Sequence, residues 1–328
     1  MTFGRYVGNI SSRFDATELM AQLASVPQWL DAGQVLPLSD GHDQVLKSDL
    51  VMGGQAVSVA IKVFGRQSLF KDWFDRRNGS KAARSYHAGA FLYQKALGTA
   101  EPIAWLDRWD DGRLVESYYL CIHVAAPCFR DALIQIYEQE QNNAGMMALL
   151  HKVAPALRRL HEAGFMHGDL GNQNILVPKS SAGTYLEPLF IDLNRSQYAS
   201  APLGDRERAH DLARIALPGA YLDIFKMIYN HHQNLPEPLA WLEKKARKRF
   251  WGHRRRSRFR HPIRFLKRLR QGQPASPYPS DKDLWLWDEK TAQPVVVLDR
   301  SEKRRLRSPR DIAITLFRGI MASPSLYR

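Results

Sequence analysis

The chain has 328 residues, of which 45% are hydrophobic and 24% charged, and this ordinary globular composition excludes a fibrous repeat or a wholly disordered protein. Its two cysteines, Cys121 and Cys128, are too few for a disulfide scaffold or a CxxC zinc site and fit a reducing compartment. The net charge is +14, and 14 Lys or Arg residues against one acidic residue lie between Glu243 and Arg270. We therefore expect a nearly neutral body with one cationic segment that attracts phosphate-rich partners.

The beginning of the chain predicts a short helix and no membrane span. The first 15 residues contain no apolar stretch, and the longest nearly apolar run, YYLCIHVAAPCF, is too short to cross a bilayer. We expect a cytoplasmic protein, either soluble or peripheral at a membrane. Asp15 followed by Glu18 predicts the N-cap and capping box of a helix that runs to Ala24, with Pro27 ending it.

Strand signals and then helix signals follow in chain order. Three strand-like runs (QVLPL, DQVLK and AVSVAIKVF) lie between residues 34 and 64, separated by turn signals at 39–41 and 53–54. A helix is expected over 80–97, two more strands near 103–106 and 114–122, and a long helical stretch over 130–162. This order predicts an α+β protein with two compact halves, and a ligand cleft where the halves meet near 124–127.

The densest polar cluster in an apolar setting is HGDLGNQNILV, residues 167–177, followed by PLFIDLNRS. Asp169 and Asn174 precede one short apolar run, and Asp192 directly follows another. Oxygen ligands at neighbouring hairpin ends suit Mg²⁺, a hard cation that keeps waters and bridges phosphates. Upstream, the run VAIK places Lys62 near the end of an apolar strand, from which its ammonium can reach a phosphate.

The combination of VAIK, H-x-D-x-x-x-x-N and an apolar strand ending in Asp resembles the eukaryotic-like protein kinase fold. The forms HGDLGNQNIL and FIDLNRS resemble the lipopolysaccharide kinase family, bacterial enzymes that phosphorylate Kdo or heptose of the inner core. The resemblance covers roughly residues 35 to 225. It implies a two-lobed fold, with an antiparallel-sheet N-lobe and a helical C-lobe, that uses ATP and Mg²⁺.

The resemblance also assigns roles to individual residues. Lys62 would bind the α- and β-phosphates of ATP, Asp169 would accept or orient the proton of the attacking sugar hydroxyl, and Asn174 and Asp192 would hold Mg²⁺. His167 would brace the loop. Gly41 best resembles the turn that covers the phosphates, with Gly53-Gly54 as the rival candidate. The adenine would bond to the backbone within 122–126, and Val124 is the expected residue.

Several positions depart from the protein kinase pattern. The helix predicted over 80–97 contains no acidic residue to pair with Lys62, so Ser85, Tyr86, Gln94 or a carboxylate from elsewhere must face that lysine. Leu193 and Asn194 replace the Phe and Gly of D-F-G, which disfavours a flipping switch. Gly171 stands where protein Ser/Thr kinases carry Lys, and the 19 positions from Asp192 to Asp211 leave no room for a long peptide-docking segment.

The basic segment has three interpretations. HPIRFLKRLR has the profile of an interfacial helix on anionic lipid, with Phe250, Trp251 and Phe259 as insertion points. The region Arg254–Arg270 would then hold the protein at the inner membrane. The alternatives are a solvated helix packed on the body through its apolar stripe, or a nucleic-acid surface, for which no reader motif is present.

Together these patterns predict a domain order and a function. The expected parts are an N-terminal helical extension (1–30), an N-lobe (31–125), a C-lobe (126–240), a basic segment (241–272) and a C-terminal hairpin and helix (273–328). The resemblance implies an ATP-dependent kinase of a lipopolysaccharide core sugar at the cytoplasmic membrane face. The alternatives are a pseudokinase or regulatory ATP-binding scaffold, and a kinase of another small-molecule or protein acceptor.

Overall fold

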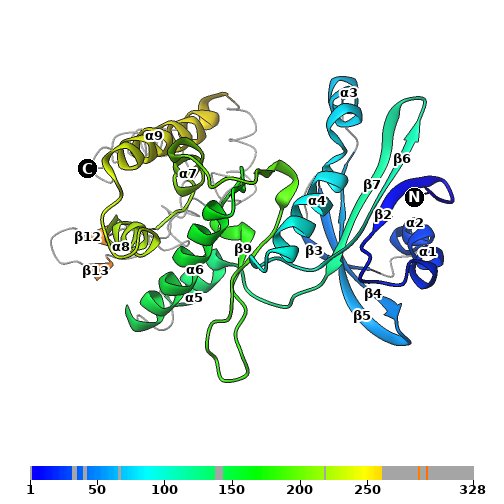
Figure 1. Cartoon of the computed structure of the whole chain (residues 1–328), viewed down its shortest axis with the longest axis horizontal. Coiled ribbons are helices and arrows are strands. Elements are labelled where there is room, and N and C mark those ends of the chain that lie inside the picture. The colour runs from blue at the N-terminus through cyan, green and yellow to red at the C-terminus, as the bar shows by residue number, and fades with distance from the viewer. Residues whose placement is uncertain are drawn as a thin grey trace, which may run out of the picture. The chain divides into compact units, whose positions relative to one another are not determined.

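The structure is a computed structural model that describes residues 2–31, 35–39, 43–65, 68–136, 143–217, 219–260, 287–288 and 293–294 (Figure 1). The chain forms two compact units. One comprises residues 1–132 and 156–203, and the other comprises residues 133–155 and 204–328.

The strands lie mainly in the first 122 residues and the longer helices mainly after them. The strands are β1 (Thr2–Phe3), β2 (Tyr6–Ile10), β3 (Leu36–Ser39), β4 (Gln44–Met52), β5 (Gln55–Val63), β6 (Pro102–Asp110), β7 (Arg113–Ile122), β8 (Phe165–Met166), β9 (Ile175–Leu176), β10 (Leu189–Phe190), β11 (Gln197–Tyr198), β12 (Trp287–Asp288) and β13 (Gln293–Pro294). The helices are α1 (Ala16–Ala24), α2 (Val26–Asp31), α3 (Leu69–Asn78), α4 (Lys81–Gln94), α5 (Phe129–Gln135), α6 (Asn143–Glu162), α7 (Asp205–Leu212), α8 (Gly219–Tyr229) and α9 (Glu237–Arg260), with short 3₁₀ helices η2 (Asn172–Asn174) and η3 (Leu193–Arg195).

The first unit is built on a seven-stranded sheet with the order β1-β2-β6-β7-β5-β4-β3. All of its neighbouring strands are antiparallel, which confirms the antiparallel-sheet N-lobe that the sequence predicts. The turn between β4 and β5 contains Gly53 and Gly54, which both have positive φ angles, as a tight hairpin connection requires. In Figure 1 the long hairpins β4–β5 and β6–β7 form the twisted body of this unit.

The first ten residues correct the prediction of a purely helical extension. Strand β2 pairs with β6, so this segment enlarges the sheet. The N-cap prediction for α1 is confirmed, because the Asp15 side chain accepts hydrogen bonds from the backbone N–H groups of Thr17 and Glu18. The capping box does not form: the Glu18 carboxylate accepts from the backbone N–H of Gly53 instead, at 2.9 Å, and so ties α1 to the β4–β5 turn.

The two faces of the sheet are covered by different helices. Helix α1 packs through Leu19 and Leu23 on a core that includes Val59 and Ile61 of β5. Since successive side chains of a strand point to opposite faces, Lys62 lies on the other face, opposite Tyr119 of β7. Helix α4 contacts β6 and β7 and comes so close that its Gly89 leaves only 3.0 Å between an added Cβ and the Tyr119 hydroxyl.

In the second unit, one face of α9 is fixed to the segment around residues 212–215. The Arg247 side chain donates to the carbonyl oxygens of Leu212 and Ile215, each at 2.7 Å, and pairs with the buried Glu243. Trp251, one turn later, is buried and donates to the Ala213 carbonyl at 3.2 Å. The prediction that Trp251 inserts into a membrane is therefore wrong, because this side chain is part of the core.

The remaining predictions for the C-terminal part fall largely outside the described residues. These include the helix over 262–270, the linker and the final helix. Within the expected hairpin, β12 and β13 pair in antiparallel orientation. Among the described helices, none combines the length and apolarity that crossing a membrane would need.

A buried carboxylate links α4 to the sheet. Asp107 of β6 is 2% exposed and accepts a hydrogen bond from Ser117 of β7 at 2.7 Å, and it also interacts with Ser80, the N-cap of α4. Burial raises the pKa of Asp107 to about 6, although these hydroxyls partly offset the shift. Because the folded state binds the proton more tightly, this group stabilises the fold at low pH, and its contribution is lost as the pH rises from about 4 through 6.

We expect Asp107→Asn to stabilise the protein at pH 8 by on the order of 1–3 kcal/mol, because it removes a charge that is costly to bury and keeps an oxygen acceptor for Ser117. At pH 3.5, where this carboxyl is mostly protonated in both the folded and the unfolded state, the variant and the parent should differ little. Denaturant unfolding at both pH values measures this, with the exposed Asp110→Asn as the control. An equal effect of Asp107→Asn at both pH values would contradict the assignment.

Candidate active site

The loop that contains Asp169 is held against a short hairpin. Strands β9 and β10 pair Ile175 with Phe190 and Leu176 with Leu189. Asn174 lies directly before β9, and its backbone carbonyl accepts from the Ile191 N–H at 3.0 Å. Its side-chain Nδ2 donates to the Asp169 backbone carbonyl at 2.8 Å. The five-residue spacing therefore forms a closed loop in which the amide of Asn174 fixes the backbone of Asp169.

His167 braces this loop, in agreement with the sequence-based prediction. Its ring is fully buried, and Nε2 lies 2.9 Å from the Ile191 carbonyl oxygen. Because a carbonyl can only accept, Nε2 carries the proton and Nδ1 is left to accept from the Asp169 N–H, at 3.4 Å. The imidazole thus joins the residues before Asp169 to those before Asp192.

Asp192 comes directly after the β10 side of the hairpin and meets Lys62. The Lys62 ammonium donates to Asp192 Oδ1, and this pair is partly buried. The same oxygen accepts from Asn194 Nδ2 at 2.6 Å. Asp192 has φ 63° and ψ 53°, a left-handed conformation that costs a non-glycine residue of order 1 kcal/mol and is concentrated at functional sites. The carboxylate that the sequence left unidentified as the partner of Lys62 is therefore Asp192 itself.

Helix α4 holds the Asp192 segment with a cation. Arg84 Nε donates to the Asn194 carbonyl at 3.1 Å, and its Nη1 pairs with the buried Asp75 at 2.8 Å. Lys81, in the first turn of α4, pairs with Asp43 at 2.9 Å. Ser85 donates to the Lys81 carbonyl, so its hydroxyl is used within the helix. Sequence reasoning noted that α4 lacks acids but missed Arg84, because its role is defined by contacts with Asp75 and Asn194 that no local pattern shows.

Arg195 is a second residue that sequence reasoning missed. Its Nη1 lies 3.0 Å from Asp169 Oδ2, and both side chains are substantially exposed. Such a pair contributes little to stability by itself. It does place an exposed cation beside the candidate base. Gly171, where protein kinases carry lysine, has no side chain to supply such a charge. The signal in the sequence was the arginine that directly follows DLN.

The two predicted nucleotide contacts have different outcomes. Gly41 lies outside the described residues, so its role stays a prediction. Val124 follows β7, the strand that pairs with β5, and its carbonyl already accepts from the Ala126 N–H at 3.0 Å. The contact of the Val124 backbone with an adenine also stays a prediction.

The donor set fits Mg²⁺ as an ion held by few protein oxygens. Since Asn174 Nδ2 is bonded to the Asp169 carbonyl, Oδ1 is the atom that remains for a ligand, and Asp192 offers a half-exposed carboxylate. Over the described part of the chain, no group of three His, Cys, Asp or Glu side chains converges as a metal site would require. Mg²⁺ takes one or two carboxylates and completes its shell with waters and phosphate oxygens, so Asn174 Oδ1 and the Asp192 carboxylate are donors of the kind it uses.

The two cysteines have the properties of packing residues. Both are free thiols, and burial raises the pKa of Cys121 to about 12 and that of Cys128 to about 11. A thiol that stays protonated at neutral pH is a poor nucleophile. Neither residue is therefore a candidate for covalent catalysis.

Part of the chain matches a known family in sequence. Residues 129–218 match the sequence model of the "Lipopolysaccharide kinase (Kdo/WaaP) family", which confirms the resemblance that the motifs predict. The matched segment contains Asp169, Asn174 and Asp192. No curated protein matches the chain in sequence.

The fold is also that of a solved kinase-family protein. A structure described as "WaaP in complex with acyl carrier protein" is similar over 74% of this chain and 98% of that chain, with 20% sequence identity and a TM-score of 0.51. At this identity the likeness concerns the fold alone. It confirms the α+β, kinase-like fold that the sequence predicts.

The glycine between His167 and Asp169 tests how tightly this loop is packed. Gly168 has φ +78°, and an added Cβ would lie 2.4 Å from the Arg195 carbonyl oxygen. We expect Gly168→Ala to lower the melting temperature substantially. The causes are backbone strain, which costs about 1 kcal/mol or more, and the clash with this oxygen. Gly183→Ala is the matched control, because Gly183 has φ +79° with no atom within 4 Å of the added Cβ. Equal decreases in melting temperature for the two variants would show that the contact with the Arg195 carbonyl oxygen does not destabilise Gly168→Ala.

Proposed function

We propose that the protein is an ATP-dependent kinase that phosphorylates a sugar hydroxyl of the lipopolysaccharide core. The observation that carries this proposal is the meeting of Lys62, from strand β5, with Asp192, from the end of the β9–β10 hairpin. The same hairpin fixes Asn174 and, through its side chain, Asp169. A phosphoryl transfer site needs these parts, a lysine, two metal-binding oxygens and an oriented carboxylate.

The residues would divide the binding of the nucleotide among them. Lys62 would move its ammonium from Asp192 to the α- and β-phosphates, and the Val124 N–H would donate to the adenine. Asn174 and Asp192 would hold Mg²⁺, which when bound supplies the positive charge that neutralises the phosphates. Because the transition state of phosphoryl transfer is loose, positioning and charge neutralisation supply most of the catalysis.

Asp169 would accept or orient the proton of the sugar hydroxyl. The Asp169 backbone is hydrogen-bonded to Asn174 and His167, and these bonds fix the position from which the carboxylate extends. Arg195 holds one oxygen of that carboxylate through an exposed pair. We propose that Arg195 takes the part of the missing lysine at Gly171, by turning toward the transferred phosphoryl group when substrates bind.

The acceptor is proposed to be a glycolipid at the cytoplasmic face of the inner membrane. The short connection from Asp192 to α7 offers no peptide-docking element, and the basic segment 241–272 provides charge that attracts an anionic surface. A regulatory ATP-binding scaffold and a kinase of another small-molecule or protein acceptor are the alternative functions. A pseudokinase would bind ATP without transferring phosphate to any acceptor.

Asp169→Asn should lower phosphoryl transfer by on the order of 10²–10⁴-fold, because it removes the proton acceptor. ATP binding, measured by calorimetry, should stay near the parent value, since the nucleotide contacts assigned above do not use this carboxylate. Transfer is measured with labelled ATP and either a membrane glycolipid extract or a protein extract, so the same assay identifies the acceptor class. Asp223→Asn, on the exposed surface of α8, is the control. Undiminished transfer by Asp169→Asn would refute the assignment.

Arg195→Met should lower the turnover number roughly 10²-fold, as does the loss of one preorganised donor to a developing charge. The melting temperature and ATP affinity should change little, because the Arg195–Asp169 pair is exposed, and Arg195→Lys should recover part of the activity. Arg13→Met is a matched control, since Arg13 is 60% exposed and pairs with Glu101 elsewhere on the surface. If Arg195→Met and Arg13→Met were equally active, Arg195 would have no part in transfer.

A further inference from the structure

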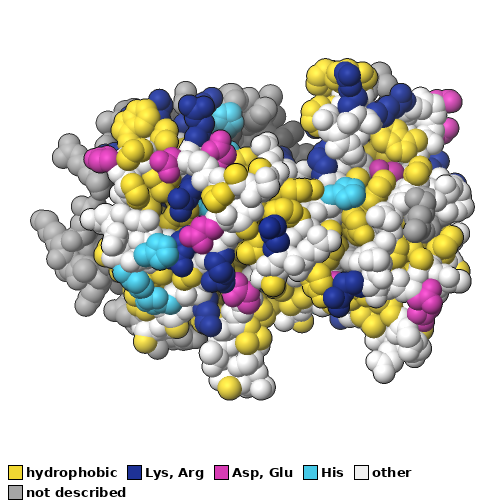
Figure 2. Space-filling view, viewed as in Figure 1, with side chains coloured by type: hydrophobic (Ala, Val, Ile, Leu, Met, Phe, Trp, Pro, Cys, Tyr) yellow, Lys and Arg dark blue, Asp and Glu magenta, His cyan; other side chains and the backbone are white. Residues whose placement is uncertain are grey.

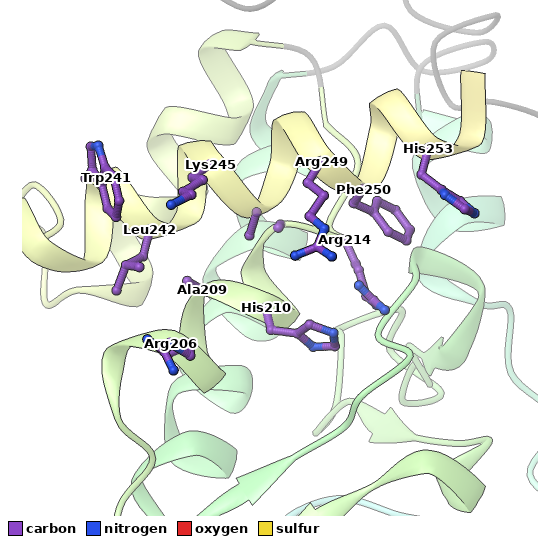
Figure 3. A pocket seen from close by; sticks show the side chains of 12 residues that line it. Arg206, Ala209, His210, Arg214, Trp241, Leu242, Lys245, Arg249, Phe250 and His253 are labelled. Atoms are coloured by element: carbon purple, nitrogen blue, oxygen red, sulfur yellow. The ribbon is translucent and has the colours of Figure 1, made fainter. Parts of the chain in front are cut away.

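A groove between α7 and α9, in the second unit, is not used by the proposed kinase chemistry. Its volume is about 1090 Å³, which is at the upper end of the range for small-molecule sites. The apolar floor is lined by Ala209 and Ala213 from the α7 side and by Leu242 and Ala246 from α9. Figure 3 shows Ala209 and Leu242 on the two sides. Trp241, with 57% of its surface exposed, lies at one end.

Cationic side chains border this apolar floor. Arg206 of α7 and Lys245 and Arg249 of α9 line the groove, and Figure 3 shows them on its two facing sides. Arg214 also lines it, with its guanidinium 4.5 Å from the centre of the Phe250 ring. In Figure 2 hydrophobic and basic side chains lie next to each other over α9.

The lining contains no carboxylate. The acidic residues of α7 (Asp205, Glu207 and Asp211) lie outside it. Among the described residues, neither Lys245 nor Arg249 forms an ion pair, although Lys245 stacks at 4.5 Å on Trp241. Two positive charges, Lys245 and Arg249, that border an apolar surface and form no ion pair among the described residues favour an anionic ligand with a hydrocarbon part.

The helix α9 explains how the sequence builds this groove. Residues 243, 247 and 251 form one stripe, which is buried and holds the helix in place. Residues 242, 245, 246, 249 and 253 form a neighbouring stripe with the spacing of successive turns, and this stripe lines the groove. Because residues 243, 247 and 251 anchor α9, they also set the position of the neighbouring residues that line the groove.

We infer that this groove binds an anionic phospholipid, with an acyl chain along the apolar floor and the phosphate at the Lys245–Arg249 side. A lipid is favoured over an acidic peptide by two further features. Trp241 lies exposed at the end of the groove, as tryptophans do at membrane interfaces. The groove also lies on the helix whose sequence leads into the arginine-rich region Arg254–Arg270, and charge of this kind attracts anionic lipid.

The test measures binding of the full-length protein to vesicles of phosphatidylglycerol and phosphatidylcholine in equal amounts, and to vesicles of phosphatidylcholine alone. The double variant Lys245→Ala/Arg249→Ala should weaken binding to the anionic vesicles by on the order of 30-fold. The matched control is Lys244→Ala/Lys248→Ala, which removes the same charge from exposed positions of the same helix outside the groove. The control variant should lose clearly less binding to the anionic vesicles than Lys245→Ala/Arg249→Ala does. Equal losses in the two double variants would show only diffuse attraction and overturn the site.

Two further measurements distinguish a lipid from other ligands. Ala246→Trp fills the groove without changing charge and should weaken binding, whereas unchanged binding, with an unchanged melting temperature, would overturn the proposal. Dodecyl phosphate should compete with the vesicles and inorganic phosphate should not; equal competition would indicate a free-phosphate site. Binding of a polyglutamate peptide but not of vesicles would indicate an acidic protein partner. None of these measurements uses ATP, so their failure is separate from failure of the kinase assignment.

Discussion

The ion pair between Lys62 and Asp192 is the interaction on which the candidate site depends. Lys62 lies on β5, an interior strand of the sheet, and is mostly buried, so its charge would cost several kcal/mol without an acidic partner. Helix α4 covers this face, and its charged side chains are all positive. The partner comes from the hairpin 130 residues later, and the pair brings the carboxylate proposed to hold Mg²⁺ next to the lysine proposed to bind phosphate. Binding of ATP would exchange one anionic partner of Lys62 for another.

The absence of an acidic residue in α4 changes how the site is held together. In protein kinases a glutamate on the corresponding helix pairs with the lysine, and movement of that helix can break the pair. Here α4 binds the backbone of Asn194 through Arg84, and Arg84 is itself fixed by the buried Asp75. The DLN segment is thus attached to the helix directly. Together with the left-handed backbone of Asp192, which Asn194 supports through its side chain, this attachment favours a constantly assembled site over a switch.

The sequence predicted the parts of this site better than their contacts. Strand alternation around VAIK and the hairpin-like runs around Asn174 and Asp192 are local patterns, so the strands, the N-cap at Asp15 and the bracing role of His167 were accessible from sequence. The partner of Lys62, the anchor Arg84 and the cation Arg195 were not, because each is defined by contacts between residues 26 to 130 positions apart or by a backbone conformation. The strand at residues 6–10 was missed for the same reason: this short strand is stabilised by pairing with β6, not by its own composition.

The basic segment shows how a charge count differs from a surface. From sequence, every arginine after Glu243 counts equally toward one cationic patch. In the structure Arg247 is 7% exposed, pairs with Glu243 and satisfies two backbone carbonyls at the end of α7, so its charge stabilises the second unit and is not available to a partner. Lys245 and Arg249, two positions to either side, face the groove instead. Since the helical repeat decides which cations are buried and which are presented, ligand binding by α9 depends on where its charges lie more than on their total.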